Sequence, residues 1–267
     1  MMKKLCLVLG AGGMKGRAHI GVIKRLVQED IDVHSIIGCS AGALVAAYYA
    51  ACGMDVKEMT ERVSDLSGWQ LLSFAIAVRN LGFLSRVAHR FSGRIPEHLE
   101  ILDKADFQTL YHGVEKMGIL AFDLCEMKEI FLHTDSSNYG ITLAEAVRSS
   151  AAIPILYRAR KIQRDGREFL LTDGGISDPL PVKYAFSPFI EADIALAVNI
   201  CKPYMVWRHL KRVRECFAER VLIVQPKVSH FGTILSSSKK TEHLIVKGSE
   251  ALIPAKIKEL KEKLELK

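Results

Sequence analysis

The sequence predicts an α/β fold with a mostly parallel sheet, and three observations support that class. Residues 5–9 (Leu-Cys-Leu-Val-Leu) form a continuous apolar run, as in strands that are buried on both faces of a parallel sheet. Residues 17–29 carry apolar side chains at helical spacing. Residues 35–39 form a second apolar run, so we expect a strand–helix–strand unit with a right-handed crossover. Both strands then end at the same edge of the sheet, where ligand sites of open α/β sheets lie.

The composition is that of an ordinary globular protein. The chain has 267 residues, of which 49% are hydrophobic and 25% are charged, enough for one large α/β domain or two small ones. It contains no internal repeat, no low-complexity stretch and no clear linker. The net charge of +7 favours anionic membrane surfaces or nucleic acid as partners. A solvated basic surface gives the same excess.

The sequence carries no signal for secretion, membrane spanning or metal binding. Its first nine residues resemble the start of a signal peptide, but Lys15 and Arg17 follow at once without a convincing cleavage site. No run of about 18 uncharged apolar residues exists, so we expect no membrane-spanning helix. The six cysteines include no Cys-x-x-Cys pair, which indicates neither a zinc site nor a disulfide framework. A reduced cytoplasm is the expected compartment.

A serine stands at the apex of the turn that follows the second predicted strand. Ser40 lies between Gly38 and Gly42 in the pattern Gly-x-Ser-x-Gly, and residues 41–51 are rich in Ala and Leu, which favours a helix. Flanking glycines let chain and substrate approach a serine on a sharp strand-to-helix turn. The helix N-terminus also favours a developing negative charge. A turn that only packs helix on strand has the same pattern, so its context decides.

The glycine-rich loop after the first strand has three competing uses. Residues 10–16 (Gly-Ala-Gly-Gly-Met-Lys-Gly) lack the order of a phosphate-binding Walker loop. They also depart from the dinucleotide pattern Gly-x-Gly-x-x-Gly, because Lys15 stands at its last position. The third use is an oxyanion hole, in which the N–H groups of Gly12 and Gly13 face a carbonyl that Ser40 attacks. The glycine loop and Ser40 emerge at the same edge of the sheet, which supports this use. Lys15 either adds positive charge to the loop or is solvated.

The rest of the chain predicts further helices and strands. In order, these are helices at 55–66 and 99–110, paired strands at 118–124 and 129–134, a helix from 142, strands at 168–172, 194–200 and 220–224, and a charged helix or tail at 256–267. Residues 69–91 are apolar but irregular, and predict either core helices or a mobile cover that contacts acyl chains. The basic segment 207–214 suits either phospholipid headgroups or solvent.

An aspartate follows the strand predicted at residues 168–172. Asp173 stands at the end of that strand, and Gly174 and Gly175 clear the backbone around it. Asp-Gly turns are common and often carry no function.

Three motifs now occur in one order, at residues 10–16, 38–42 and 173–175. Together they resemble the patatin-like phospholipases, and the combination is far more specific than any one motif. Additional stretches resemble bacterial members of that family, namely residues 19–23, 149–154 and 178–182. The resemblance covers about residues 5–225 and is weak between residues 55 and 115.

The resemblance implies a three-layer α/β/α fold with a central, mostly parallel sheet, and hydrolysis of lipid acyl esters by a Ser–Asp dyad. It makes Ser40 the nucleophile and Asp173 the base, with an oxyanion hole at Gly12, Gly13 and Met14. The remaining motif residues are Gly10, Lys15, Gly16, Gly38, Gly42, Gly174 and Gly175. The family usually has glycine where Ala11 stands, so a positive φ there costs strain.

We therefore expect residues 1–267 to form a single patatin-like domain. Its core is about residues 5–225, with a variable helical or cover region at 55–115 and a C-terminal helical extension at 226–267. The expected partners are a lipid substrate and, transiently, a membrane surface at which the cytoplasmic protein is peripheral. We expect no nucleic-acid partner, because no binding motif is present, and neither a cofactor nor a metal. The sequence indicates no oligomeric state.

Two other functions remain open. The first is a Ser–His–Asp esterase, because His209, His230 and His243 follow Asp173 in the chain order of α/β-hydrolases. His230 is the best candidate among them. Against this function, the glycine loop follows the first strand directly and Ser40 comes early in the chain. The second is a lipid-binding regulatory module with little turnover.

Overall fold

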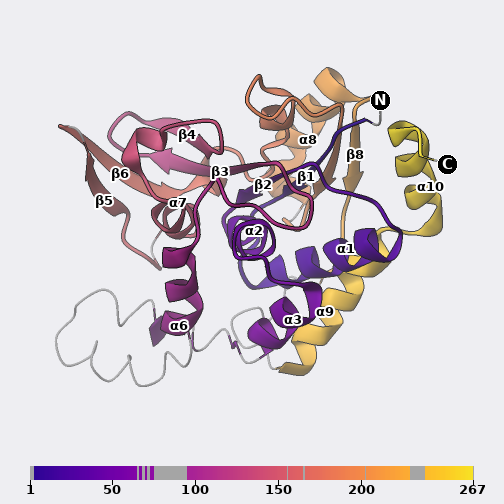
Figure 1. Cartoon of the computed structure of the whole chain (residues 1–267), viewed down its shortest axis with the longest axis horizontal. Coiled ribbons are helices and arrows are strands. Elements are labelled where there is room, and N and C mark those ends of the chain that lie inside the picture. Colours follow the sequence, from indigo (N-terminus) through magenta and orange to yellow (C-terminus); the bar gives the residue numbers. More distant parts are fainter. Residues whose placement is uncertain are drawn as a thin grey trace.

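The computed structural model describes residues 3–64, 66–67, 70, 73–74, 95–154, 156–164, 166–201, 203–228 and 238–266. An eight-stranded sheet carries helices on both of its faces (Figure 1). The strands are β1 (Leu5–Leu9), β2 (Ser35–Cys39), β3 (Lys116–Asp123), β4 (Lys128–His133), β5 (Arg160–Arg164), β6 (Arg167–Asp173), β7 (Ile194–Val198) and β8 (Val221–Val224). The described helices are α1 (Arg17–Gln28), α2 (Ala41–Ala46), α3 (Val56–Ser64), α6 (Ile95–Glu100), α7 (Leu143–Ser150), α8 (Pro203–Phe217), α9 (Ser238–Ala251) and α10 (Pro254–Leu264).

The sheet is parallel at its centre and antiparallel at one side. Its strand order is β5-β6-β3-β2-β1-β7-β8, and β4 pairs with β3 off this path. The run from β3 through β2, β1 and β7 to β8 is parallel throughout. Antiparallel pairing joins β3 to both β4 and β6, and β5 to β6. The predicted three-layer α/β/α fold with a mostly parallel sheet is confirmed.

Two hydrophobic cores cover the two faces of the sheet. Successive side chains of a strand point to opposite faces, and β1 divides accordingly. Leu5, Leu7 and Leu9 pack with residues of α1, α2 and α9, whereas Cys6 and Val8 pack with the 3₁₀ helix Val182–Phe186 and α8. Figure 1 shows α1, α3 and α9 below the sheet and α8 above it. Because both faces are covered, β1 is apolar throughout.

Strands β2 and β6 meet end to end against the same edge of β3. Strand β4 occupies one edge of β3 along residues 118–123. On the other edge, β2 pairs in parallel as far as Cys39 opposite Leu120, and antiparallel β6 takes over with Asp173 opposite Ala121. The C-terminal ends of β2 and β6 are therefore neighbours, although 133 residues separate Ser40 from Asp173.

The structure departs from the sequence-based expectations at two places. Residues 99–110 were expected to be one helix, but α6 ends at Glu100, a 3₁₀ turn spans Ile101–Lys104, and residues 105–110 are not helical. The carboxylate of Asp106 accepts the N–H groups of Gln108 (2.8 Å) and Thr109 (2.6 Å), a local turn that competes with helix. Strand β5 was not predicted, because it is charged along its length and buries only Ile162.

The C-terminal helices pack into the larger core. Helix α9 lies along α1 in Figure 1, and the two backbones approach closely at a pair of glycines. A Cβ on Gly21 would meet the carbonyl oxygen of Ile245 at 1.8 Å, and one on Gly248 would meet that of Ala18 at 1.9 Å. Leu260 and Leu264 of α10 are buried in the same core. Both helices lie in the region predicted as a helical extension.

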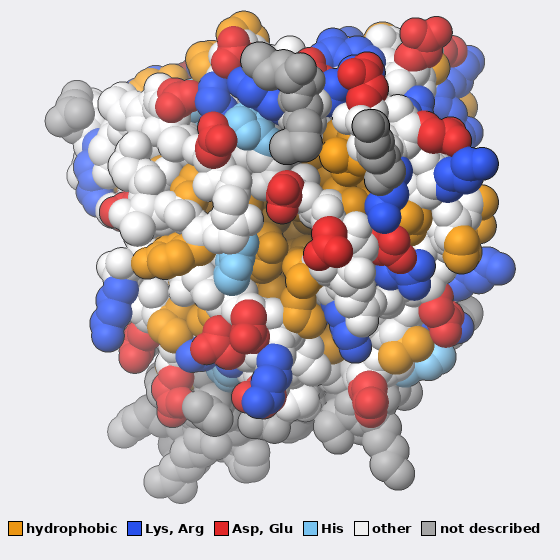
Figure 2. All heavy atoms as spheres, turned by 45° about the vertical axis from the view of Figure 1, so that its right-hand side comes forward, with side chains coloured by type: hydrophobic (Ala, Val, Ile, Leu, Met, Phe, Trp, Pro, Cys, Tyr) orange, Lys and Arg blue, Asp and Glu red, His pale blue; other side chains and the backbone are white. Residues whose placement is uncertain are grey.

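The surface seen in Figure 2 mixes charges of both signs. Basic and acidic side chains are interspersed on this face, and hydrophobic side chains show between them. The described part of this face therefore carries no broad patch of one sign. Within the described residues, no helix is both long enough and apolar enough to cross a bilayer.

Candidate active site

Ser40 occupies a strained turn between β2 and α2. Its φ of 55° and ψ of −121° lie in a region that non-glycine residues rarely adopt, and such strain clusters at functional sites. Gly42 makes the turn possible, since a Cβ there would lie 2.1 Å from the carbonyl oxygen of Leu9. At Gly38 a Cβ would lie 2.5 Å from the Cα of Ala43. Both glycines of the Gly-x-Ser-x-Gly pattern are thus required by close backbone packing.

Asp173 and Ser40 form a direct hydrogen bond. The Ser40 hydroxyl donates to Oδ2 of Asp173 at 2.6 Å, and the backbone N–H of Gly175 donates to Oδ1 at 2.8 Å. Gly174 has no room for a side chain, because a Cβ would meet the carbonyl oxygen of Leu120 at 2.5 Å. Both oxygens of the carboxylate are therefore held in place, with one of them on the serine.

Burial changes the acidity of this carboxyl. Asp173 is 5% exposed and Ser40 is 3% exposed. Loss of water around the carboxylate raises the pKa of Asp173 to about 6, and the hydrogen bonds from Ser40 and Gly175 partly oppose that rise. A carboxylate with this pKa is a better proton acceptor than an exposed aspartate and is still ionised near neutral pH.

The glycine loop presents backbone donors beside the serine. The N–H groups of Gly12, Gly13 and Met14 make no backbone hydrogen bond to any described residue, as expected at the start of the 3₁₀ helix Gly13–Gly16. The same three residues line a cavity together with Ser40. Free donors beside the serine are what an oxyanion hole needs, and the assignment of these residues to one stays a prediction. Gly13 has a φ of 56°, which favours glycine there.

Ala11 fits the loop without strain. It does not adopt a positive φ, and its N–H donates to the carbonyl oxygen of Pro179 at 2.8 Å. Its Cβ also bounds the space at Gly175, where an added Cβ would lie 3.0 Å away. The departure from the usual family residue therefore costs no backbone strain and leaves the donors of the next residues free of backbone partners.

Lys15 and Gly16 have structural positions in this loop. The Lys15 ammonium donates to the carbonyl oxygen of Ile200 at 2.6 Å. A Cβ on Gly16 would meet the Cβ of Ala41 at 2.7 Å, so this glycine allows the loop to pack against α2. Gly10 passes close to β7, and its N–H donates to the carbonyl oxygen of Val198 at 3.2 Å.

Sequence reasoning did not assign roles to two residues that hold the site. Ser150 ends α7 and accepts the backbone N–H of Ser40 at 2.9 Å, while its own hydroxyl donates to the carbonyl oxygen of Leu120 at 2.6 Å. His19 is fully buried, and its Nε2 bonds the carbonyl oxygen of Gly10 at 2.8 Å. Burial lowers the pKa of His19 to about 4, so the neutral ring donates that hydrogen bond. In the sequence, His19 is a single polar residue on an otherwise apolar helix face, a pattern that indicates a buried polar contact.

The described histidines after Asp173 do not reach its carboxylate. The ring of His209 lies against Asp178, with Nδ1 and Oδ1 3.5 Å apart. His243 is exposed on α9. His230, the residue expected for a Ser–His–Asp triad, lies outside the described residues. In the described part of the chain, the polar partners of the Asp173 carboxylate are Ser40 and Gly175.

A cavity of about 690 Å³ opens beside Ser40. Its walls are largely apolar, with contributions from Ile20, Leu44, Val45, Met59 and Val63. A volume and lining of this kind suit a lipid chain. Most of residues 69–91, expected as core helices or as a cover, lie outside the described residues.

Comparison with known proteins identifies the family. The profile of the patatin-like phospholipases matches residues 7–186. An uncharacterized NTE family protein of Mycobacterium bovis, Mb1092c, is 32% identical over 206 residues, which are 74% of this chain and 49% of that protein. The lysophospholipase NTE1 of Cryptococcus neoformans is 37% identical over 81 residues, 27% of this chain and 5% of that protein. This chain thus spans about half the length of the first of these relatives.

A solved structure has a similar fold. The crystal structure of VipD from Legionella pneumophila superposes with a TM-score of 0.52 at 13% identity, covering 98% of this chain and 67% of that one. At this identity the likeness concerns the fold alone. The family match over most of the chain places this protein in the patatin-like phospholipase family.

Proposed function

We propose that this protein is a serine-dependent lipid acyl hydrolase that cleaves carboxylic esters of phospholipids or lysophospholipids. The observation that carries the proposal is the 2.6 Å hydrogen bond from Ser40 to a buried Asp173 carboxylate, at the wall of an apolar cavity. Family membership supports the same reaction class. The relative named as a lysophospholipase supports a lysophospholipid as the first substrate to test.

The reaction begins when Asp173 accepts the proton of the Ser40 hydroxyl as its oxygen attacks the ester carbonyl. Negative charge then develops on the carbonyl oxygen, and the N–H groups of Gly12, Gly13 and Met14 are placed to receive it. Such donors are each worth about 3 kcal/mol of barrier. The leaving alcohol takes the proton from Asp173, and an acyl group remains on Ser40. Asp173 then takes a proton from a water molecule whose oxygen attacks the acyl group, and it gives that proton to the Ser40 oxygen as the acyl–serine bond breaks and the fatty acid leaves.

The decisive experiment compares wild type with Ser40→Ala and Asp173→Asn. Fatty-acid release is measured from a lysophospholipid, a diacyl phospholipid and a short chromogenic ester, with folding checked by circular dichroism. Ser149→Ala is the matched control, because Ser149 is equally buried but its hydroxyl has no described hydrogen-bond partner. Both dyad variants should lose activity and the control should keep it. Activity that survives Ser40→Ala contradicts the proposal.

The two alternative functions give different results in the same assays. A Ser–His–Asp esterase loses activity in His230→Ala, whereas the dyad mechanism leaves that variant active. A lipid-binding module releases no fatty acid in wild type, and its Ser40 does not react with a fluorophosphonate probe. Labelling of wild type that is absent in Ser40→Ala supports an activated serine.

We also propose that the expected membrane contact involves α8. Trp207 is 54% exposed on this helix, with the Arg208 guanidinium 5.5 Å from its ring centroid. Further basic side chains are exposed on the same helix, namely Lys211, Arg212 and Arg214. An exposed tryptophan among basic residues suits an anionic bilayer surface. Wild type should co-sediment with phosphatidylglycerol vesicles but not with phosphatidylcholine vesicles. Trp207→Ala should weaken the co-sedimentation with phosphatidylglycerol vesicles. Equal sedimentation of both proteins contradicts this contact.

A further inference from the structure

Among the residues that the structure describes, the Lys, Arg, Asp and Glu residues that line the cavity are all basic. They are Arg17, Arg148, Arg158, Arg160 and Lys161, and no described aspartate or glutamate lines it. Two of these groups are held by structural partners. The guanidinium of Arg17 donates to the carbonyl oxygen of Leu66, and Lys161 pairs with Glu168 at 2.6 Å.

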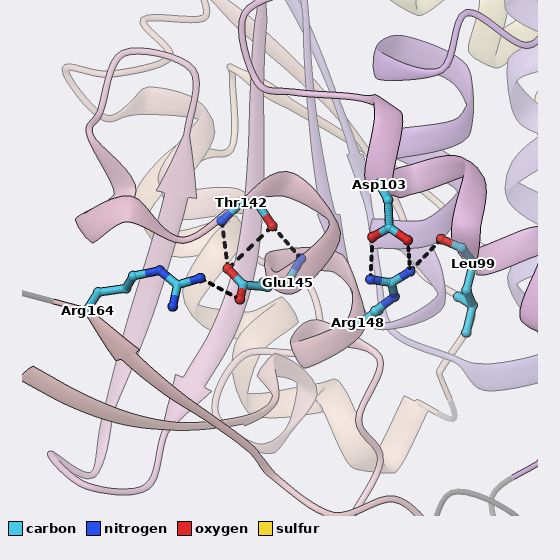
Figure 3. A network of polar contacts seen from close by, with 6 residues as sticks. All are labelled: Leu99, Asp103, Thr142, Glu145, Arg148 and Arg164. Atoms are coloured by element: carbon cyan, nitrogen blue, oxygen red, sulfur yellow. Dashed lines mark hydrogen bonds and ion pairs between the residues drawn. The ribbon is translucent and has the colours of Figure 1, made fainter.

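The negative charges of Glu145 and Asp103 act on Arg160 and oppose the lowering of its pKa by burial, but both carboxylates are already paired with other groups (Figure 3). Asp103 receives two hydrogen bonds from Arg148, at 2.6 and 2.8 Å, and Arg148 also donates to the carbonyl oxygen of Leu99 at 2.8 Å. The Glu145 carboxylate accepts a hydrogen bond from the Arg164 guanidinium at 2.9 Å and another from the backbone N–H of Thr142 at 3.0 Å. Each carboxylate is thus neutralised by an arginine other than Arg160.

Arg158 and Arg160 have no such partner. Neither makes a hydrogen bond or ion pair with any residue that the structure describes, and both side chains are solvent-accessible. Partial desolvation, and next the positive charge of Arg148, lower the pKa of Arg160. Two guanidinium groups thus line the cavity without a described ion-pair partner, and the positive charge of Arg148 acts on one of them, an arrangement that an anion stabilises.

Arg160 lies close to the proposed dyad, and Arg158 lines the same cavity as Ser40. Arg160 pairs with Leu171 in the β5–β6 ladder, and Leu171 precedes Asp173 by two residues on β6. Two residues of strand rise and one strand spacing place the Cα atoms of Arg160 and Asp173 roughly 8–9 Å apart. Ile162, on the same face of β5 as Arg160, points into the larger core, which places Arg160 on the cavity side of the sheet.

We propose that Arg158 and Arg160 bind the phosphate of a lipid headgroup and make the site selective for anionic lipids. The inference rests on the proposed function and narrows its substrate class. Guanidinium forks bind phosphate oxygens in pairs. In a 1-acyl glycerophospholipid the ester and the phosphate lie at opposite ends of one glycerol, so an ester at Ser40 brings the phosphate within reach of these side chains. A choline headgroup carries the phosphate as well but adds a cation, which the positive charge of the arginines repels.

Binding of an ether lipid tests the inference independently of hydrolysis, because an ether has no ester for Ser40 to cleave. We would titrate wild type and the double variant Arg158→Gln/Arg160→Gln by calorimetry with a monomeric 1-O-alkyl lysophosphatidate. The uncharged 1-O-alkylglycerol of the same chain length is the second ligand. The double variant should bind the lysophosphatidate more weakly than wild type, by about tenfold or more for each guanidinium group that it has lost. Binding of the alkylglycerol should not change.

Arg164→Gln is the matched control. It removes one positive charge from the same face of β5, but from a guanidinium that Glu145 already holds, so both ligands should bind as in wild type. Equal weakening of both ligands by the double variant, or no weakening of either, overturns the proposal. Inorganic phosphate that binds as tightly as the ether lipid identifies a free-phosphate site and overturns the assignment to a lipid headgroup.

Discussion

At the scale of single residues, the protonation of Asp173 sets an expected pH dependence. A base acts only when it is deprotonated, and burial raises the pKa of this carboxyl to about 6. We expect kcat/KM for a neutral short-chain ester to be constant above that pH and to fall about tenfold per pH unit below it. The measurement is a pH profile between 5 and 8 on protein that stays folded throughout. A flat profile contradicts Asp173 as the proton acceptor.

The same burial predicts that Asp173 destabilises the folded protein at neutral pH. Its pKa is about 6 when folded and 3.8 as the unperturbed value, so between those values the native state binds more protons than the unfolded state. Stability therefore falls as pH rises through this window. Asp173→Asn removes the buried charge and should raise the free energy of unfolding at pH 8 by about 2 kcal/mol.

Urea unfolding at two pH values checks this prediction. The amide keeps an acceptor for Gly175 and offers a donor to Ser40, so the gain at pH 8 should vanish near pH 4. A variant that is less stable than wild type at pH 8 contradicts the desolvation argument. A gain in stability together with a loss of activity in Asp173→Asn would indicate that this carboxylate serves chemistry rather than folding.

Ser150 should affect catalysis through the position of Ser40. Its hydroxyl joins the Ser40 N–H to the Leu120 carbonyl, so Ser150→Ala leaves the N–H of Ser40 and a carbonyl of β3 without this partner. We expect kcat to fall about tenfold with little change in KM, since roughly 1–3 kcal/mol of positioning is lost. Ser149→Ala should leave both constants unchanged. Equal effects of the two variants contradict the positioning role.

Residue identity explains which parts of the site were predictable. Ser40 and Asp173 carry groups that the reaction itself needs, and short glycine patterns mark both, so the sequence indicated them. His19 and Ser150 act on backbone atoms of Gly10 and Ser40. Nothing in a local pattern states which carbonyl or N–H a buried polar side chain will meet, because that partner is fixed by tertiary packing.

At the scale of elements, the N-terminus of α7 offers a test of local stabilisation. Thr142 accepts the N–H of Glu145 at 3.2 Å, and the Glu145 carboxylate accepts that of Thr142 at 3.0 Å. The helix that the sequence predicts from residue 142 thus begins with a capping box. Thr142→Ala should lower the free energy of unfolding by about 1 kcal/mol.

Thr60→Ala is the control for that substitution. Thr60 lies inside α3 and bonds the carbonyl oxygen of Val56, four residues earlier. Alanine is the better helix former at such a position, so stability should stay equal or rise slightly. Urea unfolding of both variants gives the comparison, and equal losses contradict a specific role of the cap.

Elements with strong periodicity were predictable and those fixed by context were not. Residues 5–9 and 35–39 match β1 and β2 at both ends, because a doubly buried strand needs apolar residues throughout. Strand β5 is charged, and only pairing with β6 makes it a strand. Its first residue, Arg160, belongs to the proposed phosphate site, so a segment that was not predicted from the sequence contributes to the proposed selectivity.

At the scale of the whole molecule, long-range packing completes the fold. The C-terminal ends of β2 and β6 meet along one edge of β3, and this brings Ser40 and Asp173 together. A parallel βαβ unit predicts the edge at which Ser40 emerges, but the antiparallel return of β6 comes from pairings far apart in sequence. The contact of α9 with α1 is equally non-local, and it joins segments at opposite ends of the chain.

The contact between α1 and α9 leads to a prediction about the stability of the whole protein. Gly248 lies where its backbone touches the carbonyl of Ala18, and an added Cβ would approach that oxygen to 1.9 Å. Because the obstacle is backbone, the helices must separate, and Gly248→Ala should cost on the order of 2 kcal/mol of folding free energy. In an exposed helix the same change would stabilise by up to about 1 kcal/mol. Val246→Ala, at a 45% exposed position of α9, is the control and should have little effect. Urea unfolding that shows Gly248→Ala to be as stable as wild type would mean that α9 does not pack on α1 in solution.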